Sequence, residues 1–359
     1  MGPLVFHRCV FFYVEEEMAL TKQEISQIRE ELDSCKNPVY FFDDDADGLS
    51  SFLLLYRYKR EGHGVVVKAN SLNASFARKV EEYLPDKVFI LDVPVVDPNF
   101  LSQVKVPVIY IDHHGTEKKQ GVKYFNPRLN GSGNCCTTEM CYEIVEADEW
   151  IAMVGAVGDW RLPDYTELFN KKYPGLLGEA ATPDEAYFNS KLGLLVKIFS
   201  FILKGQTKEV YKCIKILTRV SNPQELLDNK TAAASFIWKK FSSINKEYEE
   251  LLTEAKKDKP KDEFLVYIYP SGKMSFTKDL SNELLYNFPD KVIIVGREKA
   301  GEIKFSVRSA KHILPPLIIE ALQGVDGYGG GHEHAVGVCV KKKDLDVFME
   351  KFKALIRKN

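Results

Sequence analysis

The sequence predicts an α/β protein with a parallel-sheet domain, a helical connector and a smaller α/β domain towards the C-terminal end. In the first third of the chain, short apolar segments alternate with helical patterns, as they do in parallel sheets covered on both faces. A long helical stretch follows, and then a second set of short apolar segments. We therefore expect a sheet domain over residues 19–184, a connector over 185–261 and a second domain over 262–359.

The composition is that of an ordinary globular chain of two domains. Of 359 residues 45% are hydrophobic, and the net charge is −2. Nucleic-acid binders commonly carry a positive excess, so any contact with nucleic acid is expected to be local or made through metal ions. The seven cysteines include no CxxC pair, which argues against a zinc ribbon and a secreted disulfide framework and favours the cytoplasm. Because no run of 18 apolar residues exists, no membrane-spanning helix is expected.

The N-terminal segment is not expected to be a signal peptide. Arg8 interrupts the apolar residues from Leu4 to Val14, and no cleavage site of small residues follows. Thr21 and Glu24 have the spacing of a capping box at the start of a helix. Met18, just before this pair, is therefore the expected translation start.

The elements of the first domain follow from the apolar pattern in order. We expect helices over 21–35, 49–60, 76–83 and 140–160, a turn over 43–48, and strands over 39–42, 65–68, 88–91 and 106–111. This alternation predicts a parallel sheet, and ligands of such sheets bind beyond the carboxyl ends of the strands.

The second half of the chain predicts a helical stretch followed by a smaller domain. We expect mostly helix over 185–258, a further helix near 280–285, a glycine-rich turn over 327–331, and strands over 264–269, 292–296, 304–308 and 335–340.

Four acidic residues follow the first apolar strand directly, at positions 43, 44, 45 and 47. Like charges at a strand end are costly unless a cation binds there, and hard divalent cations prefer oxygen ligands. The alternative is an acidic loop or helix start, where aspartate caps well.

Three further clusters occupy similar positions along the chain. Asp92 follows the apolar segment 88–91, and Asp112, His113 and His114 follow 106–111. Asp159 ends an apolar helical segment. Imidazole suits Mn, Fe or Zn better than Mg or Ca. Because strand ends of a parallel sheet share one edge, we expect the four clusters to form a single metal site.

The ordered series resembles the motif set of the DHH phosphoesterase superfamily. Its motifs are Asp43-x-Asp45-Ala46-Asp47-Gly48, then Asp92, then Asp112-His113-His114, then Gly158-Asp159. The form DADG followed by Leu-Ser-Ser is similar to the RecJ-type exonucleases, including their archaeal relatives. Phe41 stands where other branches, such as the inorganic pyrophosphatases, have a histidine.

The segment GYGGGHEHAVGV, from Gly327 to Val338, resembles the GGGH signature of the DHH-associated C-terminal domain. Glycines let the backbone approach a phosphate closely, and a guanidinium matches phosphate geometry. The resemblance therefore implies substrate contacts from His114 and from Arg308, Gly329, Gly330, Gly331 and His332. The alternatives are a tight turn for the glycines and a surface ion pair for Arg308.

The resemblance also implies a two-metal site, with Mn²⁺ expected and Mg²⁺ as the second choice. Asp92 would bridge the cations, Asp45 would hold one with help from Asp43, and Asp47, His113 and Asp159 would hold the other. The catalytic set would be Asp92, Asp112, His113 and His114, with Asp112 and His114 in supporting or phosphate-contacting roles. For the segment 126–139, a substrate-facing loop and a plain connecting loop are equally supported.

Three functions remain open at this point. The first is a single-strand-specific exonuclease on DNA or RNA that releases nucleoside monophosphates, in DNA repair for example. The second is a phosphodiesterase for very short substrates, such as a nanoRNase or a cyclic-dinucleotide hydrolase. The third is a scaffold in a replication or repair complex. Expected partners are single-stranded nucleic acid or short oligonucleotides, a replication or repair protein and further copies of the chain, but no membrane.

Overall fold

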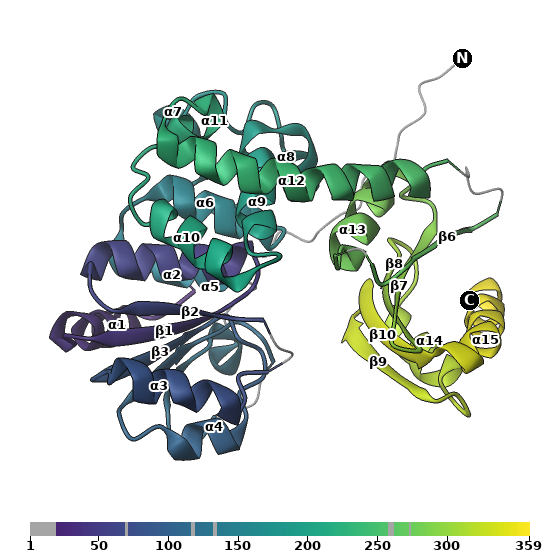
Figure 1. The fold of residues 1–359 in the computed structure, drawn as a ribbon, viewed down its shortest axis with the longest axis horizontal. Helices are drawn as coiled ribbons and strands as arrows, with labels where there is room; N and C mark the ends of the chain where they lie inside the picture. The colour runs from purple at the N-terminus through teal and green to yellow at the C-terminus, as the bar shows by residue number, and fades with distance from the viewer. Residues whose placement is uncertain (1–18, 69–70, 116–118, 132–134, 258–261, 273) are drawn as a thin grey trace. The chain divides into compact units, whose positions relative to one another are not determined.

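The computed structural model describes residues 19–68, 71–115, 119–131, 135–257, 262–272 and 274–359 (Figure 1). They form two compact units, which divide between Phe241 and Ser242, within helix α12 (Ala232–Ala255). The start predicted at Met18 lies outside the described residues. A division into three parts, with a separate connector over 185–261, stays a prediction.

The first unit is built on a parallel sheet, as predicted, and this sheet has five strands, of which β5 was not predicted. Its strands lie in the order β2-β1-β3-β4-β5, with bounds β1 (Pro38–Asp43), β2 (His63–Val67), β3 (Lys87–Leu91), β4 (Val108–Ile111) and β5 (Lys123–Phe125). The three central strands β1, β3 and β4 are almost wholly buried, which explains their continuous apolar sequence.

Helices cover both faces of this sheet (Figure 1). On one face, Phe41 and its apolar neighbours pack with α3 (Ala77–Tyr83) and α4 (Pro98–Gln103). On the other face, Phe42 stacks on Phe52 of α2 (Ala46–Lys59), with ring centroids 4.7 Å apart. Burying each large apolar side chain contributes about 1.5–3 kcal/mol, so alternate residues of one strand fix a helix layer on each side.

The strand order contains a switch point between β1 and β3. After β1 the chain adds β2 on one side, and then returns to add β3 on the other side. The connections beyond the carboxyl ends of β1 and β3 therefore run to opposite faces of the sheet, and ligands of such sheets bind at this kind of position. Asp43 and Asp92 lie at these two strand ends.

The remaining helices of the first unit pack around α2, which contacts α5, α6 and α9. The helix α1 (Lys22–Ser34) begins at the predicted Thr21–Glu24 capping box. The helix predicted over 140–160 is in fact two helices, because the chain takes a left-handed conformation at Glu146 and Asp148 between them. The helices after β5 are α5 (Thr137–Val145), α6 (Glu149–Gly158), α7 (Thr166–Lys172), α8 (Pro183–Asn189), α9 (Lys191–Ile202), α10 (Thr207–Leu217), α11 (Pro223–Asp228) and α12.

The second unit contains a mixed sheet in the order β6-β7-β8-β10-β9. Among its described strands, only β6 and β7 pair in parallel. The helix α13 contacts β7 and β8, while α14 and α15 share an apolar core with the sheet. The elements are β6 (Phe264–Tyr269), α13 (Thr277–Asn287), β7 (Val292–Lys299), β8 (Glu302–Arg308), α14 (Leu314–Ala321), β9 (Gly327–His332), β10 (Ala335–Lys341) and α15 (Leu345–Lys358).

The glycine-rich segment predicted as a turn is the edge strand β9, so this prediction was wrong. Its residues pair with β10 in antiparallel register, from Gly327 opposite Val340 to His332 opposite Ala335. The reversal of the chain lies at Glu333 and His334 instead. Glycine normally signals a turn, but here the ladder to β10 supplies the hydrogen bonds that keep the segment extended.

No helix in the described part of the chain is long and apolar enough to cross a membrane.

Candidate metal centre

Seven predicted site residues converge at the carboxyl edge of the parallel sheet. They form three overlapping groups in which the ligand atoms lie within 4.8 Å of one another. Asp92 belongs to two of these groups, and so does His113. The groups are Asp43, Asp45 and Asp92; Asp47, His113 and Asp159; and Asp92, His113 and His114.

The first aspartate segment is a strand end followed at once by a helix, not the turn predicted over 43–48. Asp45 is the N-cap of α2, and its carboxylate accepts a 3.1 Å hydrogen bond from the Gly48 amide. Asp47 is therefore buried in the first helical turn, where negative charge is favoured. A Cβ at Gly48 would lie 2.6 Å from the Asp43 carbonyl oxygen, so only glycine permits this close strand-to-helix passage.

Asp92 is held in an unusual backbone conformation at the end of β3. Its φ of 59° lies in the left-handed region, which non-glycine residues rarely adopt outside functional or tightly constrained positions. Its amide donates a 3.0 Å hydrogen bond to the carbonyl of Ile111. Burial, together with the charges of Asp47, Asp45, Asp43 and Asp159, raises the pKa of the Asp92 carboxyl well above its usual range. A cation is the group that would relieve this cost.

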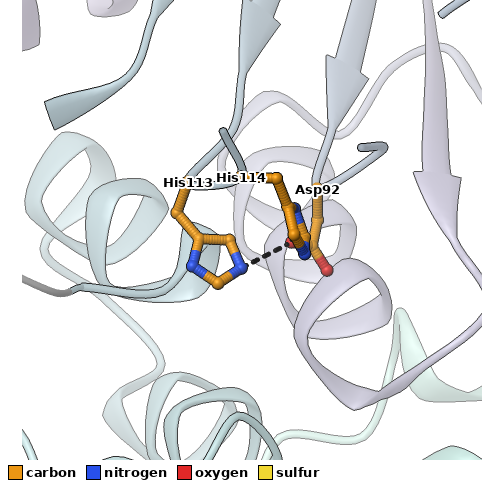
Figure 2. A group of neighbouring side chains, drawn as sticks. All are labelled: Asp92, His113 and His114. Carbon is orange, nitrogen blue, oxygen red and sulfur yellow. Dashed lines mark ion pairs between the residues drawn. The ribbon is translucent and has the colours of Figure 1, made fainter. Parts of the chain in front are cut away.

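His113 lies between carboxylates on both sides of its ring, and Figure 2 shows its position beside Asp92 and His114. Its Nε2 is 3.4 Å from Asp92 Oδ1 and 3.8 Å from Asp47 Oδ2, while its Nδ1 is 3.8 Å from Asp159 Oδ2. The buried Nδ1 has no hydrogen-bond partner among the described residues. Burial lowers the pKa of His113, which favours the neutral imidazole, the form that ligates a metal.

His114 makes a different set of contacts. Its Nδ1 is 2.8 Å from Oδ1 of the buried Asp112, and the Tyr124 hydroxyl donates to Asp112 Oδ2 at 3.1 Å. Burial lowers the pKa of His114, but the hydrogen bond to Asp112 and the charges of Asp112, Asp159 and Asp45 together outweigh burial, so the pKa is raised overall. Asp112 thus fixes the orientation of the His114 ring and is itself outside the three ligand groups.

The N-terminus of α5 supports the centre, and sequence reasoning did not single out its residues. The amides of Thr137 and Thr138 donate to the two carboxylate oxygens of Asp47, at 3.0 and 2.7 Å. The Thr138 hydroxyl also donates to Asp47, and the Thr137 hydroxyl donates to Asp92 Oδ1 at 3.0 Å. The available signal was the Thr-Thr-Glu sequence that begins a helix within the segment 126–139, of which residues 132–134 lie outside the description.

These residues suit a divalent cation. Five carboxylates supply hard oxygen donors, and two imidazoles add nitrogen donors. The unpartnered buried Nδ1 of His113 and the raised pKa of Asp92 both indicate groups arranged for a positive charge. Mixed oxygen and imidazole donors favour Mn²⁺ over Mg²⁺, although both fit the carboxylates.

Two of the predicted substrate residues of the second unit, Arg308 and His332, share one face of its sheet. Arg308 of β8 pairs with Ala335 of β10, which pairs with His332 of β9, so the three side chains lie in one row. The Arg308 Nε donates to Asn282 Oδ1 at 2.7 Å, and burial lowers the pKa of its guanidinium to about 10. Arg308 is therefore held by α13, unlike the side chain of an exposed ion pair.

The three glycines of β9 differ in what surrounds them. A Cβ at Gly329 would lie 3.0 Å from both Gly337 O and Ile318, and one at Gly331 would lie 2.4 Å from Ala335 O. A Cβ at Gly330 would meet nothing within 4 Å. Packing therefore accounts for Gly329 and Gly331, whereas Gly330 lies beside open space.

Comparison with known proteins agrees with this architecture. The model of the DHH family, N-terminal domain, matches residues 39–165, and the model of the DHHA1 domain matches residues 264–358. A search of curated proteins finds no match. The two models, matched in this order, define the class of DHH-family proteins that carry a DHHA1 domain. The chain belongs to the DHH superfamily of phosphoesterases.

Solved structures share the fold at low sequence identity. The Thermus thermophilus RecJ in complex with Mn²⁺ is 15% identical, with a TM-score of 0.67 over 96% of this chain and 56% of that chain. An exonuclease RecJ bound to manganese is 17% identical, with a TM-score of 0.61 over 92% and 93% of the two chains. CDC45 from Entamoeba histolytica is 10% identical, with a TM-score of 0.53 over 93% and 98%. This chain thus spans little more than half of the Thermus protein.

Proposed function

We propose that this protein is a two-metal, single-strand-specific exonuclease that acts on DNA or RNA and releases nucleoside monophosphates. The observation that carries the proposal is the overlap of three ligand groups at Asp92 and His113. Overlapping groups with shared members can hold two cations side by side, the arrangement that phosphodiester hydrolysis uses. The RecJ fold and the structures of RecJ proteins solved with Mn²⁺ and Mg²⁺ support the same class of substrate and cofactor.

In this proposal the ligand groups divide around Asp92. Asp43 and Asp45 would hold one cation, Asp47, His113 and Asp159 would hold the other, and Asp92 would contribute to both. When bound, the cations neutralise the phosphate and stabilise the attacking and leaving oxygens of an in-line displacement. Mn²⁺ is the preferred ion because of the imidazole donors.

The surrounding residues orient the ligands and the phosphate. The α5 N-terminus uses its amides and the Thr138 hydroxyl to hold Asp47, and the Thr137 hydroxyl holds Asp92. Asp112 accepts the hydrogen bond at Nδ1 of His114, so the opposite ring nitrogen, Nε2, can donate to a phosphate oxygen. The raised pKa of His114 favours the protonated ring that such a contact needs.

The second unit is proposed to bind the end of the substrate. Arg308 offers a fork of donors already positioned by Asn282, and His332 lies in the same row on the sheet face. Gly330, beside open space, lets a phosphate approach the backbone of β9.

A gel assay with Mn²⁺ tests the proposal. End-labelled single strands of DNA and RNA are compared with dinucleotides, using Asp92→Asn as the inactive variant. Asp97→Asn is the matched control, because Asp97 caps α4 through the Asn99 amide and lies outside the ligand groups. A ladder from long strands that persists in Asp97→Asn and disappears in Asp92→Asn is the expected result.

Two other outcomes would contradict the proposal in different ways. Cleavage of dinucleotides alone would assign the protein to the phosphodiesterases of very short substrates. Bound metal without cleavage of any substrate would indicate a scaffold. The protein would then act by binding a replication or repair partner.

A further inference from the structure

Three lysines from separate parts of the first unit meet at the turn between α9 and α10. Lys68 follows β2, Lys204 lies just after α9, and Lys240 lies in α12. The Lys68 ammonium donates to the carbonyl of Gly205 at 3.4 Å. The Lys240 Nζ lies 2.9 Å from the place where a Cβ of Gly205 would be, and Gly205 itself has a left-handed φ of 82°. We call these three residues the lysine cluster.

The lysine cluster concentrates positive charge in a chain whose net charge is −2. Partial burial lowers the pKa of Lys68, and the charges of Lys240 and Lys204 lower it further, against the opposing effect of Asp44. Glu209 forms an ion pair with Lys240 at 2.6 Å, and the charges of Lys212 and Lys239 also act on the Glu209 carboxylate. Bringing like charges together costs free energy, which an anionic ligand would offset.

Within the lysine cluster, Lys68 lies beside the strand end that carries Asp43. In the parallel pair of β1 and β2, Val67 lies opposite Asp43. Lys68 is the next residue after Val67, so it lies one residue past the level of Asp43. Neighbouring strands are about 4.8 Å apart, and the charge of Asp44 reaches Lys68. A polyanion with one phosphate at the metal centre would therefore have its adjacent phosphates near these ammonium groups.

We propose that Lys68, Lys204 and Lys240 bind the phosphates of a single-stranded nucleic acid that flank the phosphate at the metal centre. The cluster thereby makes affinity depend on the length of the strand, and a dinucleotide is too short to use it. The inference rests on the proposed function for its substrate, and it adds the surface that distinguishes a long strand from a short one. Lysine suits this task because an ammonium contacts phosphates as a point charge without reading bases.

The test compares two double variants with the same change in charge. Lys68→Gln with Lys240→Gln removes two cluster charges, while Lys171→Gln with Lys230→Gln removes two exposed charges outside the cluster. Binding of a fluorescent strand of about 20 nucleotides is measured by anisotropy in EDTA at several salt concentrations. Circular dichroism and thermal unfolding check the fold, and Lys68→Arg with Lys240→Arg tests rescue by charge alone.

The cluster variant is expected to bind the strand at least tenfold more weakly, whereas the control and arginine variants bind like the wild type. The slope of log affinity against log salt should become shallower by about 1.4, since each lost contact with a single strand removes about 0.7. Hydrolysis of a dinucleotide with Mn²⁺ should stay within about twofold of the wild type, because this substrate does not reach the cluster.

Three results would overturn the inference. The first is equal strand binding by the cluster and control variants, and the second is no strand binding by the wild type. The third is equally tight binding of polyglutamate with the same loss in the cluster variant, which would indicate an acidic protein as the ligand. Because binding is measured without metal, failure of the proposed hydrolysis would appear separately, as a wild type that binds strands but cleaves none.

Discussion

The hydroxyl of Thr137 donates a 3.0 Å hydrogen bond to Oδ1 of Asp92, the carboxylate shared by two ligand groups. The amide of the same residue donates to Asp47 at 3.0 Å. One residue at the start of α5 thus fixes one ligand from β3 and another from α2, although these lie 45 residues apart in the sequence. Both Thr137 and Asp92 are buried, so water cannot replace the missing donor easily.

Thr137→Val is therefore expected to weaken metal binding and lower kcat by about 10- to 100-fold, the usual range for groups that orient metal ligands. Valine keeps the shape of threonine but removes the hydroxyl donor to Asp92. Isothermal titration with Mn²⁺ and steady-state kinetics measure the two effects. Thr137→Ser, which keeps the hydroxyl, is the control and should stay close to the wild type. Equal losses in both variants would show that packing, not the hydrogen bond, is responsible.

Asp92→Asn should change stability and activity in opposite directions. Without metal, burial and four neighbouring carboxylates make the Asp92 charge costly, so its removal should raise the Tm in EDTA. With Mn²⁺ at about 100 times its Kd, the wild type should gain about 2.7 kcal/mol, and the variant should gain much less and be inactive. Thermal unfolding with and without Mn²⁺ measures both effects. An unchanged Mn²⁺-induced shift in the variant would exclude Asp92 as a ligand.

Glu143 should make stability decrease as the pH rises towards neutral. Its carboxylate accepts hydrogen bonds from the amides of Ala19 and Leu20, yet burial raises its pKa from 4.5 to about 7. Between these values the folded state holds a proton that the unfolded state has lost. The contribution of protonated Glu143 to the free energy of unfolding is thus fully present below pH 4.5 and is lost as the pH rises through 7.

Glu143→Gln mimics the protonated carboxyl and removes this dependence. Urea unfolding between pH 5 and 8 should find the variant increasingly more stable relative to the wild type as the pH rises, with the difference levelling off above the pKa of about 7. Parallel curves for the two proteins over this range would contradict the assignment.

Alanine variants of two glycines in β9 should distinguish a structural role of this strand from a role in substrate binding. Gly331→Ala should destabilise the second unit, because its Cβ would lie 2.4 Å from the Ala335 carbonyl oxygen in a left-handed backbone with φ of 154°. Gly330→Ala meets no neighbour within 4 Å and should leave the Tm unchanged. If Gly330 lets a phosphate approach, as proposed, its alanine variant should raise the KM for nucleic acid. A normal KM in a folded Gly330→Ala protein would leave packing as the only role of the glycine-rich strand.

Local sequence predicted much of the first unit and the residues that converge at its candidate metal centre. Strands such as Val108–Ile111 are buried on both faces, so their whole sequence is apolar; the strand was recognised, although it was expected to begin two residues earlier. The Thr21–Glu24 capping box and the aspartates after each strand are local signals as well. Because the carboxyl ends of parallel strands share one edge, the convergence of Asp43, Asp92 and His113 followed from the predicted sheet.

Signals that depend on long-range contacts were missed or misjudged. The segment Gly327–His332 is a strand only because β10 pairs with it, and β5 has just three residues, too few to display a pattern. The helix α14 was not predicted; it has two prolines in its first turn, where Pro is well tolerated. The Thr-Thr-Glu sequence signals a helix start but does not reveal the partners of Thr137 and Thr138, since their acceptors are about 45 and 90 residues away.

The sequence by itself determined that carboxylates and imidazoles would gather at the end of a parallel sheet, because strand direction and side-chain chemistry are local properties. Only the tertiary structure decided which groups orient them and which charges surround them. The contact of Thr137 with Asp92, and the meeting of Lys68 with Lys240 at Gly205, depend on the packing of helices far apart in the chain. Such packing follows from the burial of complete helix faces, and no single residue in the sequence encodes it.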